Sequence, residues 1–175
     1  MVLVACQGED ETLKTQNLEK VKVIQTANNE KGQQYKAKSL DIAIDAIPFE
    51  LHVPNDFPKT FHPFEPTAII DWVDMEDGED ISVELIASSN DSKRKNLTIY
   101  ARDFKINKLN KKAEKITLVN DKVVYFIPDR LSNAGHSVSV EWSTEEVFYS
   151  LNFSGKTDHP DEVKQMLLEL AQKMQ

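Results

Sequence analysis

Strict alternation of apolar and polar side chains in several short segments is the feature that most limits how this chain can fold. Successive side chains of a strand point to opposite faces of a sheet, so a period of two predicts a strand with one buried face. The alternating apolar positions are Ile81, Val83, Leu85 and Ala87; Leu97, Ile99 and Ala101; Val138, Val140 and Trp142; and Val147, Tyr149, Leu151 and Phe153. A further strand is predicted over residues 68–73.

Turn residues between these segments predict how the strands are connected. Asp77-Gly78 stands where a hairpin turn is expected, just before the strand that starts at Ile81. Asn120-Asp121 joins the apolar segments 116–119 and 123–127 in the same way. Consecutive strands joined by short turns pair with each other, so the sequence predicts an antiparallel meander.

Two helices complete the expected secondary structure. Ser39 is a cap for a short helix over residues 40–47, which Pro48 ends. A longer helix begins at Pro160 and carries one apolar stripe, formed by Val163, Met166, Leu167, Leu170, Ala171 and Met174. We expect this stripe to lie on the inner face of the sheet. The predicted fold class is α+β, with a curved, half-barrel-like antiparallel sheet packed by a C-terminal amphipathic helix and a short N-terminal helix.

Prolines and phenylalanines alternate between Pro48 and Pro66. Proline fixes its own backbone angle and favours extended conformations in the residue before it, so neither a helix nor a central strand is expected here. We expect an extended strap with its phenylalanines pointing inward. Two interpretations are open: an edge segment that covers the core, which is favoured, and a lid over an apolar groove.

The charge of the chain is negative overall but unevenly distributed. The net charge of −8 argues against a general nucleic-acid binder, because affinity for phosphate backbones depends on clustered Lys and Arg. Residues 41–84 carry twelve acidic side chains and one lysine, whereas residues 93–115 carry nine basic ones and two acidic ones. Solvated faces of paired strands explain this best. Contact with anionic lipid headgroups or a cell-wall polymer is the alternative.

The tetrapeptide Leu3-Val4-Ala5-Cys6 has the pattern of a bacterial lipobox, in which the cysteine receives diacylglycerol and becomes the new N-terminus. A signal peptide needs a longer apolar region before its cleavage site, so we expect that the natural start lies further upstream or that the chain was trimmed. Residues 1–6 are then the end of a signal peptide and its lipobox. The alternative is an apolar first strand in which Cys6 is a small buried residue.

The expected domain organisation follows from this anchor. Residues 7–38 are polar and are predicted to be a tether with one candidate short strand, Val21–Ile24. Residues 39–175 are predicted to form a single α+β domain. No segment approaches the roughly 18 apolar residues of a spanning helix, so lipid chains such as palmitate on Cys6 would hold the protein at the membrane.

Catalytic and metal-binding motifs are not recognised in the sequence. No serine lies in a Gly-x-Ser-x-Gly turn, and the four histidines lack the spacing of a metal site. The acidic run over 74–80 does not fit the EF-hand template, and there is no phosphate-binding glycine loop. We therefore predict no catalytic residues, no metal and no cofactor.

Several short motifs together resemble a known family. They are Ser39-Leu40-Asp41-Ile42-Ala43, Pro48-Phe49, Val53-Pro54, the hairpin at Asn120, Val140-Glu141-Trp142, Phe148-Tyr149-Ser150-Leu151, Ser154-Gly155 and the terminal helix. Over residues 39–175 the chain resembles an uncharacterised lipoprotein domain family of spore-forming Gram-positive bacteria. Its members are similar to the half-barrel of lipoprotein carriers. The resemblance implies a curved sheet that wraps a helix.

Two functions fit these observations. The first is a non-enzymatic binding module, lipid-anchored on the outer, extracytoplasmic face of the cell membrane, which recognises an unknown protein or a cell-wall polymer. The second is a carrier or sensor of a lipid or other apolar ligand held between sheet and helix. The candidate lining residues for the second are Phe57, Phe61, Trp72, Trp142, Tyr149, Phe153, Met166 and Leu170. An open apolar pocket of roughly 300 Å³ or more would favour the carrier.

Overall fold

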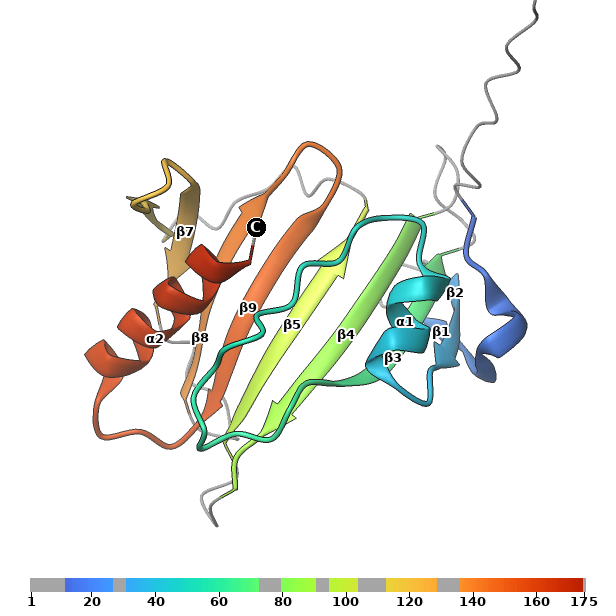
Figure 1. The fold of residues 1–175 in the computed structure, drawn as a ribbon, viewed down its shortest axis with the longest axis horizontal. Helices are drawn as coiled ribbons and strands as arrows, with labels where there is room; N and C mark the ends of the chain where they lie inside the picture. The colour runs from blue at the N-terminus through green and yellow to red at the C-terminus, as the bar shows by residue number, and fades with distance from the viewer. Residues whose placement is uncertain are drawn as a thin grey trace, which may run out of the picture.

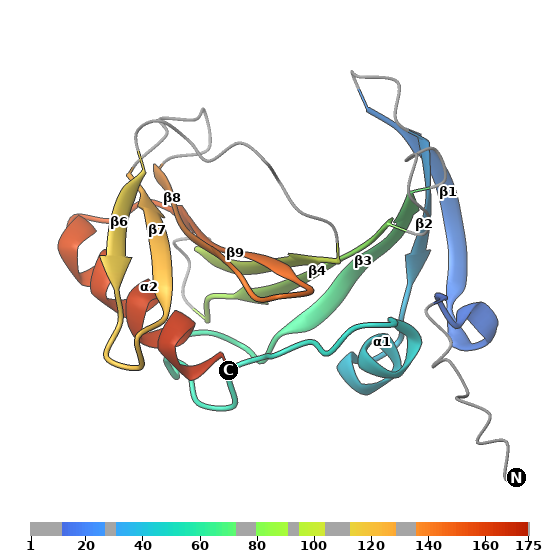
Figure 2. The same cartoon turned by 90° about the horizontal axis from the view of Figure 1, so that it is seen from above.

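Nine strands form one curved antiparallel sheet in the part of the chain that the computed structural model describes, residues 12–26, 31–72, 80–90, 95–103, 113–128 and 136–174 (Figure 1). The strands are β1 (Glu19–Gln25), β2 (Lys31–Lys36), β3 (Glu65–Trp72), β4 (Asp80–Ser88), β5 (Asn96–Arg102), β6 (Glu114–Thr117), β7 (Val123–Ile127), β8 (His136–Ser143) and β9 (Phe148–Gly155). Their order across the sheet is β1-β2-β3-β4-β5-β9-β8-β7-β6. The edges turn away from the middle strands without meeting, so the sheet is curved and unclosed (Figure 2).

The strand order departs from a simple meander at one point. Consecutive strands pair from β1 to β5 and from β6 to β9, but β5 pairs with β9 and not with β6. The burial of β6 and β9 explains why β9, and not β6, lies next to β5. Six of the eight β9 residues are buried, whereas none of the four β6 residues is. A strand as apolar as β9 needs neighbours on both sides, and a short polar strand is suited to an edge.

Both predicted helices are present. Helix α1 spans Leu40–Ala46, and the Oγ of Ser39 accepts a hydrogen bond from the backbone N–H of Ile42 at 3.4 Å. Helix α2 spans Pro160–Lys173, with acidic residues in its first turn, as expected from the dipole of a helix. The predicted α+β class with a half-barrel-like sheet is confirmed.

The two helices and the strap, residues 47–64, all cover the same face of the sheet (Figures 1 and 2). Alternate residues of the middle strands point to this face. Leu85 pairs with Ile99, Ile99 with Leu151 and Leu151 with Val140, and none of the four has any exposed surface. This row of apolar side chains forms the centre of the core, as the alternation predicted.

Helix α2 lies against β8 and β9 with its apolar stripe turned to the sheet. Leu167 and Ala171 are fully buried, and Leu170 and Met174 are each 2% exposed. Met166, at the margin of the stripe, is only partly buried. The prediction that this stripe packs on the sheet is confirmed.

The strap runs as extended chain over the middle strands. Phe49, Phe61 and Phe64 are buried against the core, and the ring of Phe57 lies 5.5 Å from that of Phe64. Phe61 also forms an isolated β-bridge with Ser89 at the end of β4. The strap therefore has the extended form and inward phenylalanines that the prolines predicted.

The N-terminal part of the described chain differs from the expected tether. Residues 19–36 form β1 and β2, which extend the sheet, although only Val21–Ile24 was predicted as a candidate strand. Before them, the N–H of Lys14 donates to the carbonyl of Ala46 at 2.8 Å, and Leu13 packs against the core. The prediction of a tether over 7–38 is therefore wrong from Leu13 to Lys36, and residues 7–11 lie outside the described residues. The domain begins well before residue 39.

Of the two predicted hairpin turns, one can be compared with the structure. Asp121 has φ = 60°, and the loop between β6 and β7 is closed by a hydrogen bond from the N–H of Leu118 to the carbonyl of Lys122. The loop therefore contains Val119 in addition to the predicted Asn120-Asp121, with aspartate in the left-handed conformation that glycine usually takes. Asp77-Gly78 lies outside the described residues.

Packing around Gly32 generates a prediction about the polar strand β2. A Cβ at this position would lie 2.8 Å from the Cγ2 of Ile70 and 3.0 Å from the Cε3 of Trp72. We expect Gly32→Ala to lower the free energy of unfolding by about 1–3 kcal/mol, because the added methyl overpacks the site. Urea denaturation measures this change.

Gln34→Ala is the matched control, because it changes the same strand two residues away without adding a Cβ. It should change the free energy of unfolding by about 0.5 kcal/mol or less. Equal stability of the Gly32→Ala variant and the wild type would contradict the close packing of β2 on β3.

Candidate binding groove

A groove with a volume of about 350 Å³ opens at one end of the core, between the strap and the first turns of α2. Its lining comes from five parts of the chain: Thr60 and Phe61 of the strap, Ser89 and Lys95 beside β4 and β5, Phe153 of β9, Thr157 and His159 ahead of α2, and Glu162, Val163 and Met166 of α2. The apolar lining residues continue the core outward. The polar ones surround them, so the groove is amphipathic.

The apolar lining is positioned by the sheet and by helical periodicity. Phe153 follows Leu151 at strand spacing and is 2% exposed, on the covered face. Val163 and Met166 are three residues apart and stand on the same stripe of α2. Phe61 is held by its bridge to Ser89, next to the hydrogen bond from the N–H of His62 to the carbonyl of Ser88 at 2.8 Å.

The polar lining is positioned by close contacts between loops. The N–H of Lys95 donates to the Oγ of Ser89 at 3.1 Å, and the N–H of Ser89 donates to the carbonyl of Lys95 at 2.8 Å. Gly155 has φ = 142°, and a Cβ there would lie 3.0 Å from the Cα of Lys95. At the start of α2, the Nδ1 of His159 lies 3.6 Å from a carboxylate oxygen of Glu162.

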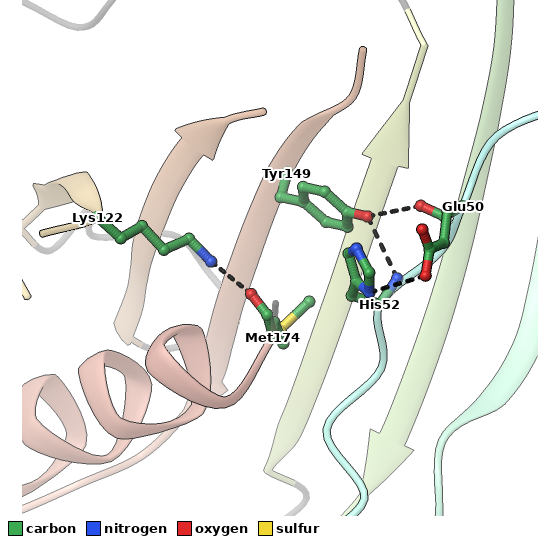
Figure 3. A network of polar contacts seen from close by, with 5 residues as sticks. All are labelled: Glu50, His52, Lys122, Tyr149 and Met174. Carbon is green, nitrogen blue, oxygen red and sulfur yellow. Dashed lines mark hydrogen bonds and ion pairs between the residues drawn. The ribbon is translucent and has the colours of Figure 1, made fainter. Parts of the chain in front are cut away.

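Near the start of β9, away from this groove, Tyr149 connects the strap to the sheet (Figure 3). Its hydroxyl donates to the carbonyl of Glu50 at 3.0 Å and accepts from the N–H of His52 at 3.2 Å. Burial raises the pKa of this hydroxyl, and the hydrogen bond from His52 opposes the rise. Since both hydrogen bonds go to the backbone of the strap, Tyr149 fixes the strap in place.

Lys122 holds the end of α2 in a similar way (Figure 3). Its Nζ donates to the carbonyl of Ala171 at 2.9 Å and to that of Met174. The same ammonium lies 4.2 Å from the centre of the Trp142 ring, and Trp142 stacks on Tyr149 at 5.1 Å. Burial lowers the pKa of Lys122 to about 8. A cation at the last carbonyls of a helix is favourable, and here it also joins α2 to the β6–β7 hairpin.

The predicted lining residues are divided among three locations. Phe61, Phe153 and Met166 line the groove. Phe57, Trp142, Tyr149 and Leu170 pack in or against the core. We expected Trp72 to lie on the covered face of the sheet with the other lining residues, and this is wrong. Its strand partners place it on the opposite face, where its Nε1–H donates to the Oγ of Ser82 at 3.0 Å.

Sequence reasoning missed the polar lining of the groove. Thr60, Lys95 and Thr157 belong to three loops that are far apart in the chain, and no spacing in the sequence connects them. Lys122 was missed for the same reason, because its partners lie about fifty residues later in the helix. The pairing of β5 with β9 and the bridge between Phe61 and Ser89 bring the groove segments together, and the pairing of β7 with β8 and β8 with β9 brings the β6–β7 hairpin to α2.

Two partly buried carboxyl groups lie elsewhere, at the far end of β3 and β5. Burial raises the pKa of Asp103 to about 6, even though the N–H of Ile81 donates to its Oδ1 at 2.8 Å, and burial also raises the pKa of Asp71. Within the described ranges, no group of three or more His, Cys, Asp or Glu side chains is arranged to hold a metal ion.

Comparison with known proteins gives no match: neither a family model, nor a curated protein, nor a solved structure is similar to this chain. The resemblance to a lipoprotein family stays a prediction. Among the described residues, none of the helices has the length and apolar character needed to cross a membrane. The lipobox cysteine, Cys6, lies outside the described residues.

The position of Tyr149 predicts how the strap is held. Tyr149→Phe removes the hydroxyl and leaves the carbonyl of Glu50 and the N–H of His52 without this partner. We expect the free energy of unfolding to fall by about 1–3 kcal/mol, the usual cost of an unsatisfied, partly buried polar group. Denaturant unfolding measures the loss, and hydrogen exchange should show faster exchange in the strap.

Tyr125→Phe is the matched control, because this partly buried tyrosine lies on β7, opposite Glu141 and on the face of the sheet that the strap does not cover. It should leave both the exchange rate of the strap and the free energy of unfolding nearly unchanged. Unaltered strap exchange in Tyr149→Phe would show that Tyr149 does not hold this segment.

Proposed function

We propose that this protein is a non-enzymatic interaction module, anchored by lipid on Cys6 to the outer face of the cell membrane. One observation carries the proposal: the protein's own segments fill the apolar face of the sheet. Leu167 and Ala171 of α2 have no exposed surface, and neither do Val140 and Leu151 of the two strands on which α2 packs. A side chain without accessible surface borders no water-sized space, so the centre of this face offers no volume to an apolar ligand.

The anchor part of the proposal is supported by the sequence of the N-terminus. Leu3-Val4-Ala5-Cys6 has the lipobox pattern, and the residues that follow are polar and acidic. Since Leu13 already packs against the core, fully extended chain from Cys6 to Leu13 would reach at most about 25 Å. A lipidated Cys6 would therefore hold the domain close to the membrane surface, where it could meet partners on or near the bilayer.

Metabolic labelling tests the anchor. Expressed behind a lipoprotein signal peptide that ends in Leu3-Val4-Ala5-Cys6, the protein should partition into membranes and incorporate labelled fatty acid, because two acyl chains on one cysteine anchor firmly. Cys6→Ala should do neither, while Thr12→Ala, which leaves the lipobox intact, should behave as the wild type. A wild-type protein that stays soluble and unlabelled would refute the anchor and return Cys6 to the interpretation as a buried residue.

A second candidate function rests on the groove. Its volume of about 350 Å³ lies within the range of small-ligand sites, and Phe61, Phe153 and Met166 were predicted as ligand lining. With Lys95 beside this apolar surface, the suited ligand is a short amphiphile with an anionic head. Six of its ten lining residues are polar, and it lies at one end of the core and not between the sheet and the helix, so we place this carrier or sensor function second.

Decanoate is a simple probe of the groove. If the carrier function holds, it should shift the NMR signals of groove residues, and Met166→Glu should abolish the shifts, because it places a negative charge in the apolar lining that contacts the ligand. Gln165→Glu is the control, because this exposed neighbour lies outside the groove. Saturable binding at the groove would favour the carrier, and absence of any shift would leave the interaction module as the proposal.

A further inference from the structure

A cavity with a volume of about 600 Å³ opens where β2 and β3 separate. The last pair between the two strands joins Tyr35 and Ile69, and after Lys36 the chain leaves the sheet for α1, which contacts β3 (Figure 1). Among the described residues, β4 is the only strand partner of the start of β3, residues 65–68. The cavity lies along the unpaired side of this segment, since the start of β3 contributes to its lining.

The deepest part of the cavity lining is apolar. Ala37 and Phe64 are only 3% and 4% exposed, and Pro66 is buried as well. Leu40, the first residue of α1, is partly buried beside them. We call these four residues the floor of the cavity. An apolar floor of this kind can contact the apolar part of a small ligand.

The remaining lining is mostly charged, and its four charged side chains are Glu19, Lys36, Lys38 and Glu65. All four are exposed. Glu19 is the strand partner of Lys36, yet the two form no ion pair. In the part of the chain that the structure describes, none of the four side chains has a hydrogen bond or an ion pair with another residue. The cavity therefore offers two ammonium and two carboxylate groups, whose charges sum to zero.

The charges and the size of the cavity together select a class of ligand. A purely anionic or purely cationic ligand would meet two groups of its own charge, which weakens binding, whereas a zwitterion has a partner for each group. A cavity of about 600 Å³ that is equally wide in all directions is about 8 Å across, the span of two to three extended residues. A peptide of this length also has main-chain groups that can pair with the unpaired side of β3.

We propose that this cavity binds a short free peptide as a zwitterion, with its amine and its carboxylate both inside the cavity. Lys36 and Lys38 bind the carboxylate, Glu19 and Glu65 bind the amine, and apolar side chains of the peptide contact the floor at Phe64. The proposal goes beyond the interaction function, because such a ligand requires neither the lipid anchor nor a protein partner.

Leucyl-leucine is the direct probe, because it carries both charges and two apolar side chains. It should bind the complete protein saturably in isothermal titration calorimetry and shift the NMR signals of residues 36–40 and 64–66. Its N-acetyl form lacks the cationic end, and its C-terminal amide lacks the anionic end. Each of these two analogues should bind about tenfold more weakly than leucyl-leucine, because each leaves one pair of charges without a partner.

Two double variants test which charges bind which end of the peptide. Lys36→Gln/Lys38→Gln should weaken the binding of leucyl-leucine by about tenfold without weakening that of the C-terminal amide, which has no carboxylate to lose a partner. Glu19→Gln/Glu65→Gln should weaken leucyl-leucine by a similar factor without weakening the N-acetyl form. All four positions are exposed, so the variants should fold as the wild type does.

Lys115→Gln/Glu146→Gln is the matched control, because it makes the same two kinds of change at exposed positions outside the cavity. It should bind leucyl-leucine with the affinity of the wild type. Three results would overturn the proposal: no saturable binding of leucyl-leucine, equal affinity for leucyl-leucine and its two analogues, or wild-type affinity in both double variants of the cavity.

Discussion

The stacked pair of Trp142 and Tyr149 is the contact on which the arrangement of the covering segments depends. The ring of Trp142 lies against the ammonium of Lys122, which binds the last carbonyls of α2. The hydroxyl of Tyr149 donates one hydrogen bond to the backbone of the strap and accepts another from it. One aromatic pair on β8 and β9 thereby fixes the helix, the β6–β7 hairpin and the strap relative to the sheet. Each of these segments is short, and tertiary contacts supply most of the stability of such elements.

This arrangement has a direct consequence for function. A curved sheet could hold an apolar ligand, but here the centre of its covered face is occupied by α2 and the strap. The spaces that remain lie at the margins: the groove at the start of α2, and an open cavity of about 600 Å³ bordered by the end of β2, the start of α1 and the start of β3. Both are lined by apolar side chains together with charges of both signs.

Much of the fold could be predicted because the apolar period of two is strict in β4, β5, β8 and β9, and the stripe of α2 is unambiguous. Strand β2 could not be predicted, because Gly32 and two glutamines carry no apolar pattern. The strand forms through close packing on β3. The face of Trp72 was also undetermined, since Ile69 and Ile70 make both faces of β3 apolar. The pairing of β5 with β9 depends on contacts about fifty residues apart, which local patterns do not encode.

Native mass spectrometry of the protein purified from its own cells tests most directly the claim that the covered face is filled. A denaturing spectrum of the same sample measures any acyl chains bound covalently to Cys6, so only the difference between the two spectra reports a ligand held by the fold. The account predicts that no lipid or other apolar molecule is held non-covalently in stoichiometric amount. Stoichiometric recovery of such a ligand would contradict it.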